Sequence, residues 1–238
     1  SVNALPYVIL RLPDVIGPRD STSRFWRYQL WLKYFATRLG RPVPVPKPVQ
    51  KLRTSYVYAP DVATLIAQLV ERSTSVSVDA FDFINQVFNL GFSGDPKLLE
   101  ELLGDIAQFA IHNQNVRSSG TSVDDVISNT DSTDGLYYFP SVTRGSVDIS
   151  RAERILLWSP TPWEQALEET AAFYDRAETE FSSELQQTLD ELMNDLDDQK
   201  PFTDEERLES QKIQMYFGQK IRTQTRSEHS RENAKDEL

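Results

Sequence analysis

The sequence contains no cysteine, and this absence excludes disulfide bonds, thiolate metal sites and a cysteine nucleophile. Its only histidines, His112 and His229, lie too far apart along the chain to predict a histidine-rich metal cluster. No apolar run approaches the roughly 20 residues that a membrane-spanning helix requires. We therefore expect neither a metal site nor a membrane span in these 238 residues.

Charge is present but unevenly distributed, and the formal net charge is -11. Residues 1–60 carry ten lysines and arginines against two aspartates, and they include several aromatic residues between positions 25 and 31. This segment either binds anionic ligands or forms an amphipathic helix with a solvated basic face. Residues 164–206 carry fifteen acidic residues against two basic ones. We interpret them as a solvated acidic helix, with low-affinity calcium binding as the alternative; no Asp-x-Asp-x-Asp-Gly loop supports a specific site.

Alternating strand and helix patterns predict an α/β chain with parallel strand pairing. Apolar and turn residues predict a strand over 7–16, a helix over 22–39, a strand and helix over 54–72, a strand over 86–92, and helices over 95–113 and 150–177. The proline-rich residues 40–53 are expected to be an extended connector, and residues 113–135 a polar loop. The acidic helix breaks at residues 197–202, and nothing after Gln199 is expected to pack.

Four stretches, in this order, resemble the C-terminal half of the extended short-chain dehydrogenase/reductase family, also called the NAD-dependent epimerase/dehydratase family. They are "VILRLPDVIGPRD", "SYVYAPDVATLIAQLV", "QVFNLG" and "VDISRAERILLWSPTPWEQALEETAAFY". The resemblance spans about residues 5–176. It implies the C-terminal part of a Rossmann-like parallel sheet plus a substrate lobe, over residues 1–178, followed by an acidic helical and polar tail over residues 179–238.

The cofactor and catalytic motifs of that family are missing from this chain. The family binds its dinucleotide through a Gly-x-x-Gly-x-x-Gly turn and does its chemistry with a Tyr-x-x-x-Lys pair, both expected upstream of residue 1. The nine glycines never form that turn, and the one matching pair, Tyr216 and Lys220, lies in the charged tail, where we interpret it as a coincidence. We therefore assign no catalytic residue here.

The resemblance does assign binding residues to this chain. Leu12 and Pro13 would lie beside the nicotinamide of NAD or NADP, and Asp14 stands where the family has a substrate-binding Asn. An ionised Asp only accepts hydrogen bonds and repels phosphate, so this departure argues against a nucleotide-linked sugar. Arg53 and Arg144 approximate the arginines that pair with a substrate diphosphate, and each is alternatively a surface residue. Asp61 is expected to support the fold by capping.

The chain ends in Lys235, Asp236, Glu237 and Leu238, the signal by which luminal proteins are retrieved to the endoplasmic reticulum. This ending predicts the KDEL retrieval receptor as a partner and the endoplasmic reticulum lumen as the location.

Together these patterns predict part of an NAD(P)-dependent oxidoreductase, epimerase or dehydratase that acts on a small-molecule carbinol and is inactive as this chain alone. We expect no nucleic-acid partner, and a homodimer is compatible with the resemblance. The alternative is a non-catalytic luminal module that binds partners or calcium through its acidic helix.

Overall fold

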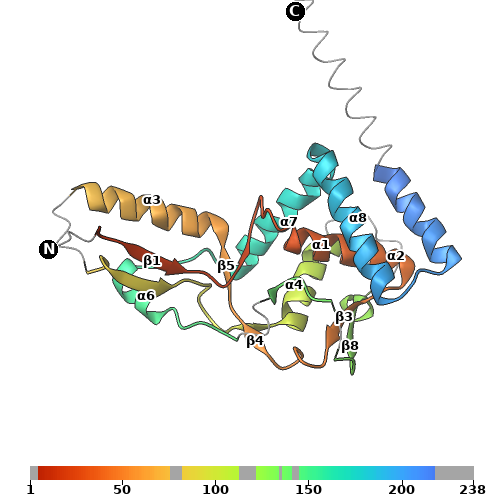
Figure 1. Ribbon diagram of the computed structural model, residues 1–238, viewed down its shortest axis with the longest axis horizontal. Helices are drawn as coiled ribbons and strands as arrows, with labels where there is room; N and C mark the ends of the chain where they lie inside the picture. Colours follow the sequence, from red (N-terminus) through yellow and green to blue (C-terminus); the bar gives the residue numbers. More distant parts are fainter. Residues whose placement is uncertain (1–4, 76–81, 113–121, 134–135, 141–144, 218–238) are drawn as a thin grey trace, which may run out of the picture.

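The computed structural model describes residues 5–75, 82–112, 122–133, 136–140 and 145–217 (Figure 1). Its strands are short and pair two by two, and three of the four described pairs are parallel. The pairs are β1 (Val8–Arg11) with β6 (Gln86–Asn89), β2 (Asp14–Ile16) with β5 (Tyr56–Tyr58), β3 (Val43–Pro46) with β8 (Ile127–Thr130), and the antiparallel β4 (Arg53–Thr54) with β7 (Lys97–Leu98). The predicted α/β class with parallel pairing is confirmed.

Helices occupy most of the remaining described chain. They are α1 (Arg24–Leu30), the π-helical segment η1 (Trp31–Ala36), α2 (Thr37–Leu39), α3 (Ala59–Ser75), α4 (Leu99–His112), α5 (Val123–Val126), α6 (Ser150–Leu156), α7 (Trp163–Glu180), α8 (Ser182–Gln199) and a helix over residues 204–217. The helix predicted over 22–39 is present, although its middle is the wider π form, which often marks a functional or strained position. All six residues of η1 are buried.

Two strands replace the single strand predicted over residues 7–16. The chain leaves β1 at Leu12 and Pro13 and resumes as β2, so that β1 pairs with β6 while β2 pairs with β5. Pro13 has no backbone N–H and therefore cannot continue a hydrogen-bonded ladder. The break redirects the chain at Leu12 and Pro13, the residues that the resemblance places beside the nicotinamide.

The apolar side chains form two cores. The smaller core surrounds the β1–β6 pair, with α3 and α6 on opposite sides of it (Figure 1). Val62, Leu65 and Leu69 project from α3 toward Phe88 of β6, in the spacing of an amphipathic helix. The larger core gathers α1, η1, α4, α7 and α8. Each large apolar side chain that is fully buried in these cores stabilises the fold by about 1.5–3 kcal/mol.

Asp61 supports the fold, although its partner lies outside its own helix. Its carboxylate accepts hydrogen bonds from the backbone N–H of Thr161 at 2.8 Å and from the Thr161 hydroxyl at 2.7 Å. The start of α3 is thereby tied to the turn that precedes α7. The two cores are joined at this point because α3 packs in the smaller core and α7 in the larger.

Three expectations about irregular segments were wrong. Residues 43–46 form β3 despite their prolines, because Pro44 and Pro46 alternate with valines and therefore remove donors from one strand edge only. Residues 123–130, expected within a loop, form α5 and β8. Residues 204–217, expected to be unpacked, form a helix whose Ile213 and Phe217 are buried.

The acidic segment packs against the body of the fold. Leu185, Leu189, Leu192 and Leu196 of α8 are buried in the larger core, as are the apolar residues of α1. The chain on either side of residue 178 therefore shares one core. Tyr216 lies on the last described helix, whereas Lys220 lies outside the described residues.

Candidate functional site

A crevice opens at the carboxyl end of β2, and its lining includes Pro13 and Asp14, to which the resemblance assigns cofactor and substrate contacts. It has a volume of about 450 Å³ and is lined by residues 13–22, Arg24, Ala59 and Pro140; we call it the β2 crevice. Parallel strands in α/β folds present ligand sites at this end. The crevice exists because β2 stops at Ile16, and Gly17 follows with a φ of 140°, a backbone conformation that glycine adopts without strain.

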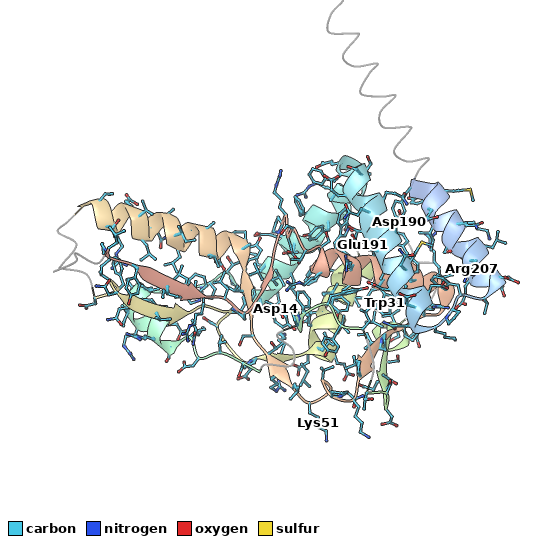
Figure 2. All side chains as sticks on the ribbon, viewed as in Figure 1. Asp14, Trp31, Lys51, Asp190, Glu191 and Arg207 are labelled. Carbon is cyan, nitrogen blue, oxygen red and sulfur yellow. The ribbon has the colours of Figure 1, made fainter. Side chains whose placement is uncertain are left out.

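Asp14, which Figure 2 labels, is buried, lines this crevice and is paired with an arginine. Arg24 Nη1, at the start of α1, donates to Asp14 Oδ1 at 2.7 Å. From the sequence alone, Asp14 is expected to be an isolated negative charge that repels phosphate. In the folded chain its charge is compensated by Arg24, so the pair is electrically neutral toward a ligand.

Of the other predicted binding residues that the structure describes, Pro13 lies next to Asp14, whereas Arg53 lies elsewhere. Pro13 lines the β2 crevice, whereas Leu12 lies beside it with an exposed side chain. Arg53 lies on β4, where its guanidinium binds Glu101 at 3.1 Å and the carbonyl oxygen of Pro96 at 2.7 Å. Arg144 and the four C-terminal residues, Lys235 to Leu238, lie outside the described residues.

A second cavity, which the sequence did not reveal, lies where the start of α1 faces α7 and α8. It has a volume of about 550 Å³, and we call it the α8 cavity. Its lining residues are 19–23, Trp26, Arg27, Phe173, Tyr174, Ala177, Phe181, Glu184, Gln187, Thr188 and Glu191. Residues 19–22 line both the α8 cavity and the β2 crevice. The aromatic residues near position 26 were the only sequence signal for it.

The wall between the two cavities is held by Tyr174 of α7. The Tyr174 hydroxyl donates to the carbonyl oxygen of Gly17 at 3.3 Å and accepts from the backbone N–H of Asp20 at 3.1 Å. Burial raises the pKa of Tyr174 further above its ordinary value near 10, and the protonated phenol acts as the donor to Gly17. Arg19, between these anchors, has a φ of 64°, a left-handed conformation that side chains other than glycine rarely adopt.

Three of the six acidic side chains of α8, namely Glu191, Asp195 and Asp197, pair with arginines. Glu191 pairs with Arg27, and Asp197 pairs with Arg207 at 3.1 Å; Figure 2 labels Glu191 and Arg207. No group of three or more His, Asp or Glu side chains that could hold a metal ion occurs in the part of the chain that the structure describes. None of the described helices is long and apolar enough to cross a bilayer.

Comparison with known proteins gives structural likeness without sequence matches. No family model and no curated protein matches this sequence. Solved structures that resemble it include the UDP-glucose 4-epimerase of Thermotoga maritima, at 20% identity over 73% of this chain and 47% of that chain, with a TM-score of 0.47. A UDP-glucuronic acid 4-epimerase of Bacillus cereus is 19% identical over 71% of this chain and 45% of that chain, with a TM-score of 0.46. A dTDP-glucose 4,6-dehydratase of Bacillus anthracis is 15% identical over 71% of this chain and 44% of that chain, with a TM-score of 0.46.

This chain spans less than half the length of each of those enzymes. Because every TM-score is below 0.5, the assignment to the α/β class rests on the strand pairing described above.

Proposed function

We propose that this chain is the substrate-side part of an NAD(P)-dependent oxidoreductase, epimerase or dehydratase that transfers hydride between the dinucleotide and a small-molecule carbinol. The β2 crevice carries the proposal. It opens at the carboxyl end of parallel strands, and residues 13–17, part of the segment that resembles the family's substrate and nicotinamide contacts, line it.

The residues of this chain fit only the edge of a dinucleotide site. Pro13 lines the crevice, but the sequence offers no glycine turn for a pyrophosphate. The Tyr-x-x-x-Lys pair that would act on the substrate is likewise absent from the crevice. The proposal therefore assigns phosphate binding and proton transfer to residues outside this sequence, and we expect the 238 residues alone to be inactive.

The proposed function predicts a difference between the natural full-length protein and residues 1–238. We expect the full-length protein to carry or bind NAD(P) at about one molecule per chain, and the isolated residues to bind none, because they lack a phosphate cradle. Calorimetric titration with NAD(H) and NADP(H), together with nucleotide release by acid, measures both. A full-length protein that binds no dinucleotide, or micromolar binding to residues 1–238, would refute the proposal.

Exchange of Asp14 for asparagine tests the crevice itself. In Asp14→Asn the Arg24 guanidinium loses its carboxylate partner and becomes free to bind an anion. We expect the full-length variant to shift its preference toward phosphorylated or nucleotide-linked substrates by about tenfold in kcat/KM, equivalent to about 1.4 kcal/mol. Arg24→Gln in the same background is the matched control and should cancel the shift. An unchanged substrate profile would leave Asp14 as a structural residue.

We further propose that the full-length protein is retained in the endoplasmic reticulum lumen through Lys235, Asp236, Glu237 and Leu238, which the KDEL receptor would recognise. Deletion of these four residues should send the protein into the medium, because retrieval reads the free carboxyl end. Fractionation of cells that express each version measures this. A control that replaces the four residues with alanines should behave as the deletion does. A cytosolic intact protein, or equal retention of the deleted one, would contradict the assignment.

A further inference from the structure

Strand β1 is hydrogen-bonded along only one of its edges within the described residues. It pairs with β6, and these two strands form a sheet of their own. The carbonyl oxygens of Tyr7 and Arg11 accept from backbone N–H groups just before and just after β6. Backbone groups of successive residues point to opposite edges of a strand, so the N–H and C=O groups of Val8 and Leu10 point to the open edge. An open edge of this kind is a template for another strand.

The side chains of β1 leave this edge unprotected. Tyr7 and Ile9 are 50% and 46% exposed, and Arg11, on the same face of the strand, is exposed as well. The side chains between them pack against the smaller core. Proteins commonly protect open edges with charges or prolines, but Arg11 is the only charge between Pro6 and Pro13. The stretch between the two prolines is therefore available for pairing.

A second exposed apolar strip lies on α3. Ile66 and Val70, one helical turn apart, are 48% and 59% exposed. Arg72 lies over the ring of Phe83, which precedes β6, at 4.8 Å. Because successive residues of an α-helix are turned by about 100°, Ile66 and Val70 project about 120° and 160° away from Arg72, and thus away from β6. Figure 1 shows α3 on the β1 side of the strand pair and α6 on the β6 side, so the strip borders the open edge of β1.

The open edge is complementary to itself when two copies of the strand run antiparallel. With Ile9 of one copy opposite Ile9 of the other, Val8 of each copy stands opposite the partner's Leu10. The backbone groups of these two residues point across the edge, so the two Val8–Leu10 pairs would form about four hydrogen bonds, and the Ile9 pair would be the closer, non-hydrogen-bonded one. On the exposed face, each Tyr7 ring would stand opposite the partner's Arg11, as a cation–π contact requires. A two-fold axis between the Ile9 residues generates this register.

We propose that the β1 edge is an interface for a second copy of this chain, which joins the two β1–β6 pairs into one four-stranded sheet. An isolated two-stranded sheet is marginally stable, whereas additional strands and covering helices stabilise it. The two-fold axis is perpendicular to the sheet, so both α3 helices lie on the same face and their strips of Ile66 and Val70 meet. This inference does not depend on the proposed enzymatic function. A strand from outside this sequence would compete for the same edge in the full-length protein, so the tests use residues 1–238.

Crosslinking tests the register, because the chain contains no cysteine of its own. In Ile9→Cys the two thiols face each other across the axis, where the Cα atoms of a non-hydrogen-bonded pair are about 4.5 Å apart, within the span of a disulfide. We expect mild oxidation to give a covalent dimer on a non-reducing gel. Tyr7→Cys is the matched control: its thiol stands opposite the partner's Arg11, so its yield of dimer should be at least about fivefold lower.

Sedimentation velocity over a range of protein concentrations measures the affinity. We expect a monomer–dimer equilibrium with a dissociation constant in the micromolar range, as for small interfaces. Ile9→Lys brings two like charges together at the axis and should raise this constant at least about tenfold. Leu208→Lys, at a 55% exposed leucine on the last described helix, should leave it unchanged. A protein that stays monomeric at every concentration, a dimer that Ile9→Lys leaves intact, or equal crosslinking of the two cysteine variants would overturn the proposal.

Discussion

Replacement of Lys33 by methionine should lower the free energy of unfolding by about 3–5 kcal/mol. The Lys33 side chain is 4% exposed, and its Nζ lies 2.6 Å from Glu178 Oε1 and 2.9 Å from Asp175 Oδ1. Glu178, only 2% exposed, also accepts from the Tyr34 hydroxyl at 2.9 Å. Without Lys33 the Glu178 carboxylate would be buried with no positive partner. An uncompensated buried charge of this kind strongly destabilises the folded state.

Urea-induced unfolding followed by circular dichroism measures this loss. Lys51→Met is the matched control, because Lys51 is exposed, and it should change stability by less than about 0.5 kcal/mol (Figure 2). The double variant Lys33→Met with Glu178→Leu removes both charges and should recover most of the loss. A change below about 1 kcal/mol in Lys33→Met would mean that water reaches Glu178 in solution.

Replacement of Arg41 by methionine is the second large effect, with an expected loss of about 3–5 kcal/mol. The Arg41 guanidinium binds both carboxylate oxygens of Glu206, at 2.7 and 3.0 Å. It also donates to the carbonyl oxygens of Leu196, Lys200 and Pro201, and it lies 4.0 Å from the centre of the Phe202 ring. One side chain therefore joins the end of α8 to the helix over residues 204–217.

In Arg41→Met we expect this helix to detach before the rest of the chain unfolds, because its main link to the body is gone. Hydrogen exchange of residues 204–217 measures the detachment. Arg38→Met, which removes an arginine whose guanidinium only lies over the Tyr34 ring, is the control and should leave exchange unchanged. Equal protection in both variants would show that Ile213 and Phe217 hold the helix by packing alone.

The same link makes stability depend on acid pH. The hydrogen bonds from Arg41, together with those from Thr203, lower the pKa of Glu206 from 4.5 to about 2. Because the folded pKa is below the unfolded one, this group stabilises the fold fully above about pH 4.5 and loses that contribution as the pH falls toward 2. In Arg41→Met the pKa returns toward 4.5, so the acid-dependent step in hydrogen exchange should shrink.

Local sequence signals predicted most of the helices and strands but not the tertiary contacts between them. The periodic patterns of α3, α4 and α7 are complete within each segment, so they were readable without the rest of the chain. The helix over 204–217 was also readable: Thr203 and Glu206 form a capping box, with Glu206 N–H donating to the Thr203 hydroxyl at 3.3 Å. The helix was not predicted because most of its residues are polar or charged.

The candidate sites depend on contacts between distant residues, and such contacts leave no local pattern. Arg24 compensates Asp14 across a turn, and Lys33 meets Glu178 from a helix 145 residues away. The π-helical segment shifts the phase of its side chains, so a 3.6-residue period does not place Lys33 facing α7. The resemblance assigned binding residues to the segment that lines the β2 crevice, but none of its four stretches extends to α8.

The shared wall of the two cavities has a thermodynamic consequence. Residues 19–22 border both spaces, and Tyr174 fixes them through Gly17 and Asp20. A molecule that shifts this wall on entering one space changes the affinity of the other. Linkage then requires the coupling free energy to be equal in both directions. A ligand in the α8 cavity and a ligand in the β2 crevice would therefore change each other's binding affinity by the same factor.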